Sequence, residues 1–327
     1  MRKVEYIIAN VDQTKTPNHV LELIAFFNTL YQLKIFLLLI KYLQDLWHKE
    51  FINYQAGLKV INDQEALIIN IPMSQICNPS EYGDVKEAII KMAKIICEIK
   101  YKEFCEYKVW YGSLFSVSIS DKPNNSSIVK INMNVVVARL FINFCRNEKR
   151  EPIYYSKINT NIRLITKSKN TIKLYIYLCL WRNVNFLRKN FVEICDTLGL
   201  PKSYYNPNNF KKHIIEVAYP VLKKFGDVWY ELEDTKISKN NKNEYILECK
   251  IYTKENAENE ALKKNNIINM MKLHFNLNEK DISDISDIIS STSTKALSEK
   301  IIYINDNLKG VHNKAEYVKK ALINEFK

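Results

Sequence analysis

Two neighbouring segments, Phe191-Val-Glu-Ile-Cys-Asp-Thr-Leu-Gly-Leu200 and Asn206-Pro-Asn-Asn-Phe-Lys-Lys-His-Ile-Ile-Glu-Val-Ala218, decide the fold. The first segment carries apolar residues at the i, i+3, i+4 and i+7 spacing of one helix face, namely Phe191, Ile194, Cys195 and Leu198. This face stops at Gly199, a residue suited to the end of a helix because it tolerates a left-handed backbone. The spacing therefore predicts a short amphipathic helix before a turn.

The second segment predicts another helix a short turn later. Asn206 followed by Pro207 is an N-cap and first-turn pair, and Gly226 marks the other end. The residues expected to face inward are Phe210, Ile214, Val217, Ala218 and Val221. Two helices joined by a short turn make a helix-turn-helix candidate.

A β-hairpin is expected directly after this pair of helices. Apolar residues alternate with polar ones over 228–233 and again over 245–251, which predicts two strands. The connection 236–243 is rich in lysine and asparagine and would form its basic tip. This order of elements, helices followed by a β-hairpin, is typical of a winged helix.

The first half of the chain predicts the same plan less distinctly. Helices are expected over 19–47, with a break near Gln32, and over 84–99; strand-like runs cover 66–71, 101–120 and 127–133. Short apolar similarities between the halves favour an internal duplication: 33–39 with 172–178, and 89–93 with 214–218.

The predicted fold class is α+β, with two tandem winged-helix domains and a small C-terminal helical region. The first domain is expected over residues 1–150, the DNA-binding second domain over 151–253, and a linker with a helical extension over 254–327. Within the extension, helices are expected over 257–275, 296–308 and 314–326.

Positive charge points to an anionic partner. The 48 Lys+Arg exceed the 36 Asp+Glu by 12, and nearly all of this excess precedes residue 254. It is densest between 149 and 190, where a single acid accompanies these basic residues: Lys149, Arg150, Lys157, Arg163, Lys167, Lys169, Lys173, Arg182, Arg188 and Lys189. The density predicts a surface facing phosphates, although for any one lysine a solvated position is the simpler interpretation.

Other classes of function lack their sequence signatures. The seven cysteines form no CxxC pair and the histidines are scattered, so we expect a reducing cytoplasm and no metal. The six glycines build neither a Walker A loop nor a dinucleotide fingerprint, and no GxSxG or HExxH occurs. No apolar run approaches membrane-spanning length. The expected protein is not an enzyme, needs no cofactor and has no membrane partner.

Double-stranded DNA is the expected partner, because the second helix of a helix-turn-helix enters the major groove. Asparagine can read adenine there, whereas lysine and tyrosine suit guanine acceptors and phosphates. The predicted DNA-binding residues are Tyr205, Asn208, Asn209, Lys211, Lys212, His213, Lys236, Lys239, Lys242, Lys189, Lys86 and Lys94. For Asn208, capping the helix is as good an explanation as contacting DNA. For His213, packing against the core is an equal alternative to contacting phosphate.

A family resemblance sharpens this expectation. Its residues are Lys173-Leu-Tyr175, the turn Leu198-Gly-Leu200, Tyr205, Asn209-Phe-Lys-Lys-His-Ile-Ile-Glu-Val-Ala218 and Tyr230-Glu-Leu232. Together they resemble the second winged-helix domain of the iteron-binding plasmid replication initiators, the Rep family. Pro220 departs from that pattern, standing three residues later than the family's usual proline, and is expected to kink or end the recognition helix.

The resemblance implies an activity and partners. Such proteins bind repeated origin DNA in a sequence-specific manner, promote origin opening, and recruit the host replication initiator and the replicative helicase. The resemblance also implies a homodimer in equilibrium with a monomer, and repression of the protein's own gene.

Three alternatives remain open at the level of sequence. A winged-helix transcriptional regulator without a replication role shares every DNA-binding residue. An interaction protein such as a helicase loader would bind protein through the winged helices and nucleic acid through the tail. A nuclease or recombinase needs a site assembled from scattered residues.

Overall fold

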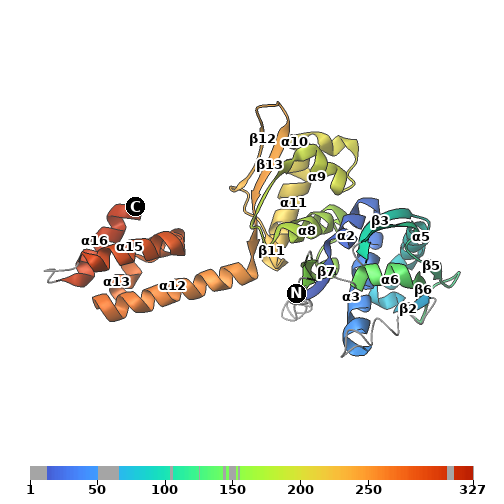
Figure 1. Cartoon of the computed structure of the whole chain (residues 1–327), viewed down its shortest axis with the longest axis horizontal. Helices are drawn as coiled ribbons and strands as arrows, with labels where there is room; N and C mark the ends of the chain where they lie inside the picture. The colour runs from blue at the N-terminus through green and yellow to red at the C-terminus, as the bar shows by residue number, and fades with distance from the viewer. Residues whose placement is uncertain are drawn as a thin grey trace. The chain divides into compact units, whose positions relative to one another are not determined.

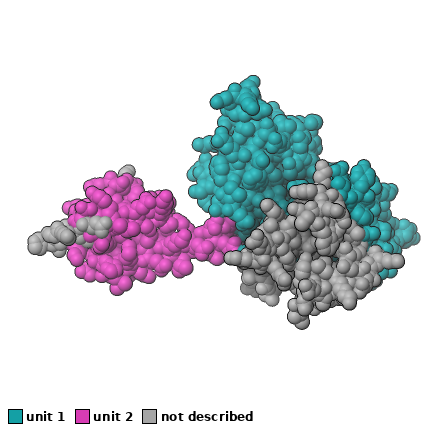
Figure 2. Space-filling view, in the orientation of Figure 1, with its two compact units in different colours: residues 1–252 teal, residues 253–327 magenta. Residues whose placement is uncertain are grey.

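The structure is a computed structural model that describes residues 13–50, 66–103, 106–124, 126–142, 145–146, 152–153, 155–307 and 313–326. The chain divides into two compact units, residues 1–252 and residues 253–327 (Figure 2). It is a mixed α+β protein in which small antiparallel sheets are interleaved with helices and a helical region closes the chain (Figure 1).

The first half of unit 1 begins with helices and is completed by small sheets. Its principal helices are α2 (Asn18–Leu21), η1 (Glu22–Phe26), α3 (Leu30–Glu50), α5 (Tyr82–Ala93) and α6 (Val135–Ile142). The expected break near Gln32 is confirmed, because the Gln32 side chain accepts the backbone N–H groups of Asn28 and Thr29 while its own N–H bonds to the Thr29 hydroxyl. This capping box starts α3 after a turn.

Two sheets follow in this half. The larger has the strand order β2 (Ala66–Pro72), β6 (Ile128–Asn134), β5 (Ser116–Ser118), and the smaller is the ribbon of β3 (Ile96–Glu103) and β4 (Glu106–Ser113). In β6 buried and exposed residues alternate strictly, which places one face of that strand against the core. The predicted helix over 84–99 ends at Ala93, since Ile96 already begins β3.

The second half repeats the arrangement in a clearer form. Its principal elements in chain order are α7 (Ile162–Ile165), α8 (Lys169–Trp181), β10 (Phe186–Asn190), α9 (Phe191–Thr197), η4 (Lys202–Tyr205), α10 (Pro207–Phe210), the π-turn η5 (Lys211–Ile215), α11 (Glu216–Phe225), β11 (Val228–Trp229), β12 (Thr235–Lys239) and β13 (Tyr245–Lys250). The sheet order is β10-β13-β12, so the first strand pairs with the last and the last with the middle one. The sheet β2-β6-β5 follows the same rule.

The N-terminal segment of unit 1 packs on the second half. Strand β1 (Gln13–Pro17) pairs antiparallel with β9 (Tyr155–Asn159), in a register that sets Gln13 opposite Asn159. The Ser156 hydroxyl donates to the Asn18 side chain at 2.9 Å, and Lys169 Nζ donates to the Asn28 carbonyl at 2.8 Å. One hydrophobic core runs through both halves as a result.

The core confirms the first helix of the quoted segment and corrects other expectations. Phe191, Ile194, Cys195 and Leu198 are all fully buried. The expectation for Val217 is wrong, since 46% of its surface is exposed. The expected phosphate-facing surface between 149 and 190 is also wrong in part, because three of its basic side chains are buried: Arg163, Lys173 and Arg182. Lys149 and Arg150 of this predicted surface lie outside the described residues.

Unit 2 is a helical unit with its own apolar core. It contains α12 (Lys254–Phe275), α13 (Glu279–Asp284), α14 (Ser286–Ser291), α15 (Thr294–Asp306) and α16 (Lys314–Phe326), which confirms the three helices predicted there. Lys319 ties α16 to α13, with its Nζ 2.8 Å from the Asp281 carboxylate. Within the described ranges no helix is long and apolar enough to cross a membrane.

Candidate nucleic-acid interface

The turn between α9 and α10 depends on Gly199. Its φ is +56°, the left-handed region that glycine adopts without strain, and the Leu200 N–H returns to the Cys195 carbonyl at 2.9 Å. A side chain would also find no room, because a Cβ at Gly199 would lie 2.2 Å from the Ala25 carbonyl oxygen of η1. The predicted helix end at this glycine is confirmed, and the close approach to Ala25 is a second reason for it.

The second helix begins as the sequence predicts. Asn206 is the N-cap, its side chain accepts the backbone N–H of Asn208 at 2.9 Å and of Asn209 at 3.3 Å, and Pro207 fills the first turn. Capping therefore belongs to Asn206, and the side chain of Asn208 is exposed. The side-chain amide of Asn209 already has a partner within the protein, since its Nδ2 donates to the Ser203 carbonyl at 3.0 Å.

Tyr205 closes the turn from the other side. Its hydroxyl donates to the Asp196 carboxylate on α9, and this bond is the main cause that raises the pKa of Tyr205 to about 12. Lys202 Nζ lies 4.0 Å from the centre of the same ring. A phosphate that approached the Tyr205 hydroxyl would have to compete with Asp196.

Three consecutive exposed side chains, Lys211, Lys212 and His213, follow the capped turn. They occupy the π-turn η5, whose remaining residues Ile214 and Ile215 are buried. Neither lysine forms an ion pair with any carboxylate that the structure describes. This segment therefore presents positive charge that the protein itself does not neutralise.

Pro220 was expected to kink or end the helix, and the second of these expectations is wrong, because the helix continues through it. Helix α11 runs on to Phe225. Pro220 has no N–H for the Glu216 carbonyl, but both residues are exposed, so water can bond to that carbonyl. The π-turn η5 immediately precedes α11. The last residue of η5 is Ile215, and its carbonyl accepts a hydrogen bond from the buried Tyr230 hydroxyl at 2.6 Å.

The hairpin is formed by β12 and β13, so the prediction of its first strand over 228–233 is wrong. Only β11 (Val228–Trp229) is a strand there, and it pairs with β14 (Tyr252–Thr253). The predicted tip over 236–243 is correspondingly shorter, because residues 236–239 belong to β12.

The hairpin ends in a lysine-bearing tip. The Asn240 side chain accepts the backbone N–H groups of Lys242 and Glu244, each at 2.9 Å, and Asn243 takes a left-handed φ of +63°. Lys239 lies 5.3 Å from the centre of the Tyr245 ring. A shallow hollow of about 410 Å³ at the tip is lined by Arg188, Lys239, Asn240, Asn241, Lys242 and Glu244.

Lys236 lies on a different part of the same hairpin. The register sets Lys236 and Arg188 on either side of Glu248, so these three residues share one row across the sheet. Arg188 Nε is 3.0 Å from the Glu248 carboxylate. The central acid thus offsets part of the positive charge on this face.

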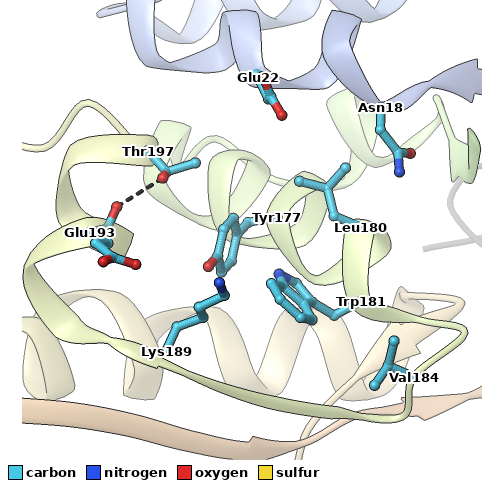
Figure 3. Close-up of a pocket in the computed structure, with 9 residues that line it drawn as sticks. All are labelled: Asn18, Glu22, Tyr177, Leu180, Trp181, Val184, Lys189, Glu193 and Thr197. Atoms are coloured by element: carbon cyan, nitrogen blue, oxygen red, sulfur yellow. Dashed lines mark hydrogen bonds between the residues drawn. The ribbon is translucent and has the colours of Figure 1, made fainter. Parts of the chain in front are cut away.

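The remaining predicted residues are placed apart from the helix α10–α11. Lys189 lies on the same face of β10 as the buried Leu187. Its Nζ is 5.3 Å from the centre of the Trp181 ring, and both residues line a separate pocket (Figure 3). In the first half, Lys86 Nζ is 2.6 Å from the Asp121 carboxylate. Lys94 is exposed at the C-terminal end of α5.

A buried polar network supports the interface and was missed from the sequence. Lys173, 2% exposed, donates to the Leu198 carbonyl at 2.6 Å, which satisfies the C-terminal end of α9. The Tyr175 hydroxyl donates to the Asp227 carboxylate at 2.5 Å, and Arg182 lies 3.2 Å from the same carboxylate. The tyrosine oxygen also accepts the Asn159 N–H at 2.7 Å. The Lys-Leu-Tyr motif therefore holds α8 to its neighbours.

What the site can do chemically is bind anions. In the described ranges no group of three or more His, Cys, Asp or Glu side chains could hold a metal ion. The cysteines Cys77, Cys97, Cys179, Cys195 and Cys249 are free thiols. Burial raises the pKa of Cys195 to about 12 and of Cys249 to about 11, which keeps both thiols protonated at neutral pH.

Two comparisons of the chain with known proteins found no match. No family model matches the chain, and no curated protein matches it either.

Proposed function

We propose that residues 151–253 form a winged-helix DNA-binding domain. Helix α9, the turn at Gly199 and the helix α10–η5–α11 follow the order of a helix-turn-helix, and β12–β13 follow as a hairpin. The observation that carries the proposal is the pair of unneutralised lysines Lys211 and Lys212, with the exposed His213 beside them, on the first turns of the second helix, directly after its capped start. Cations in that position suit the phosphates and base edges of a major groove.

The first half supports a second domain of the same kind. Its sheet β2-β6-β5 has the strand order of β10-β13-β12, with α3 before the first strand and α5 before the last two. The likeness is in element order, and the ribbon β3–β4 is an addition to it. Two such domains in one chain would read two adjacent sites on DNA.

The function we propose is that of a plasmid replication initiator, which binds repeated origin DNA and opens the duplex beside it. Support comes from the motif resemblance, the tandem arrangement and the free lysines. The test places the gene with its flanking DNA on a selectable circle without another origin. We expect maintenance of the circle, and its loss when Lys211 and Lys212 are both changed to alanine. Repression of the gene without maintenance would instead favour a transcriptional regulator.

Self-association is part of the same proposal. Neither edge of the ribbon β3–β4 pairs with another strand in the described ranges. Its outer face presents Ile96 and Val109, each 55% exposed, and Tyr111, 74% exposed. An unpaired, partly apolar ribbon can pair with a second copy of itself. We therefore place the proposed dimer contact there.

A further inference from the structure

A cavity of about 530 Å³ lies away from the helix α10–α11, between the N-terminal segment and the second half (Figure 3). Helix α2 and η1 contribute Asn18 and Glu22, and the rest of the lining comes from α8, the turn after it, β10 and α9. The walls are held together by the β1–β9 pairing and by the Ser156–Asn18 hydrogen bond. Its volume is within the range of sites that bind small ligands or side chains.

An aromatic pair forms one wall. The ring centres of Tyr177 and Trp181 are 6.5 Å apart, and Leu180 and Val184 extend the apolar lining beside them. Lys189 places its ammonium 5.3 Å from the centre of the Trp181 ring. The indole face is therefore already oriented to accept a cation.

Two carboxylates complete the cavity. Glu22 extends into it from η1 and Glu193 lines it from α9 (Figure 3). Neither has an ion-pair partner among the side chains that the structure describes, and burial raises the pKa of Glu22. With Lys189 as the one cation in the lining, the cavity is net acidic, although the chain as a whole carries +12.

We propose that this cavity binds a guanidinium group on an aliphatic stem, as presented by an arginine side chain of a partner protein. Trp181 would stack on the guanidinium, the two carboxylates on different sides of the cavity would attract its charge, and Leu180 and Val184 would contact the stem. A nucleotide fits the aromatic wall but not the charge, because its phosphate would meet two unpaired carboxylates. The site is therefore distinct in chemistry from the proposed DNA interface.

The test uses N-acetyl-arginine amide, with N-acetyl-citrulline amide as the neutral analogue of nearly the same shape. The full chain is labelled with ¹⁵N, and the indole signal of Trp181 is assigned by Trp181→Phe. We expect a saturable shift of that signal with the arginine derivative, with a Kd in about the millimolar range, and no comparable shift with the citrulline derivative. A peptide carrying one arginine between leucines should bind more tightly than the free derivative if a protein segment is the natural source.

Two variants separate this proposal from its alternatives. Glu22→Gln should weaken binding about two- to fivefold, since it removes one of the two negative charges of the lining at a position that solvent still reaches. Lys189→Met removes the cation that occupies the indole face, so it should strengthen arginine binding. Equal shifts with citrulline, no effect of Glu22→Gln, or a shift of the Trp181 signal by a thymidine oligonucleotide instead would each overturn the proposal, whether or not the protein starts replication.

Discussion

The hydroxyl of Tyr230 donates to the carbonyl of Ile215 at 2.6 Å, and both residues are buried. Ile215 ends the π-turn of the proposed recognition helix, and Tyr230 lies beyond the end of α11. The bond therefore fixes the helix at the point where its backbone changes from a π-turn to an α-helix.

Removing this hydroxyl should destabilise the protein. We expect Tyr230→Phe to lower the free energy of unfolding by about 1–3 kcal/mol, because the Ile215 carbonyl is left without this buried donor. Tyr245→Phe is the matched control: Tyr245 is 39% exposed, and its change should stay within about 0.5 kcal/mol. Urea unfolding followed by circular dichroism measures both. Equal effects would show that the bond does not support the helix.

The free lysines should carry DNA affinity. We expect Lys211→Ala with Lys212→Ala to abolish specific binding to the direct repeats beside the gene and to reduce the salt dependence of the remaining non-specific binding by about two phosphate contacts. Fluorescence anisotropy at several salt concentrations measures this. Lys295→Ala with Lys320→Ala is charge-matched and changes exposed residues of unit 2, so its affinity should stay near that of the wild type. Unchanged affinity in the first variant would contradict the assigned recognition helix.

Lys173 should give the protein a specific pH dependence. Burial lowers its pKa from 10.5 to about 8. Between these values the unfolded chain binds a proton that the folded protein has released, so stability rises with pH through this window. Relative to Lys173→Met, the wild type should gain up to about 1.4 kcal/mol per pH unit. Because titrating tyrosines and cysteines are common to both proteins, their effects cancel in the difference. A difference in stability that does not change with pH between about 8 and 10 would contradict the lowered pKa of Lys173.

Gly199 and Gly83 should respond in opposite directions to alanine. At Gly199 the left-handed φ and the contact with Ala25 predict a loss of about 2 kcal/mol or more. At Gly83, inside α5, an added Cβ meets no atom within 4 Å, and alanine should stabilise the helix by about 1 kcal/mol. Thermal unfolding of the two variants measures the contrast. Similar shifts for both would argue against the close approach to Ala25.

The proposed dimer contact should be sensitive to charge. We expect Tyr111→Glu to shift the protein toward the monomer, because a carboxylate on the exposed face of β4 opposes burial against a second copy. Light scattering after size exclusion reads the mass directly. The control is Tyr303→Glu, which changes an exposed tyrosine of unit 2 and should leave the measured mass unchanged. A dimer that persists in Tyr111→Glu would place the contact elsewhere.

Local signals in the sequence were sufficient for the helix pair. The spacing of Phe191 and Leu198, the glycine after them, and the Asn206-Pro207 start each depend on neighbours within one or two turns, and the structure confirms them. Val217 shows where the pattern fails. An apolar residue beside the inward face is exposed because the π-turn changes which residues of the helix face the core.

The buried charges were beyond the reach of pattern reasoning. Lys173 bonds to a backbone carbonyl 25 residues away, and Arg182 lies against a carboxylate 45 residues away. Composition counts such residues as surface charge, although their partners exist only after folding. Lys189 is exposed, but its contact with Trp181 was also not predicted, because strand alternation alone does not show that Trp181 lies beside it.

The pairing of β1 with β9 bears on how the protein is made. The Thr14 hydroxyl and the Ile158 carbonyl lie within 3.5 Å although 144 positions separate them. At ordinary rates of translation the ribosome needs on the order of ten seconds to make the intervening chain. Throughout that interval the nascent first half carries β1 without its partner strand, so it completes its fold only once the second half has emerged.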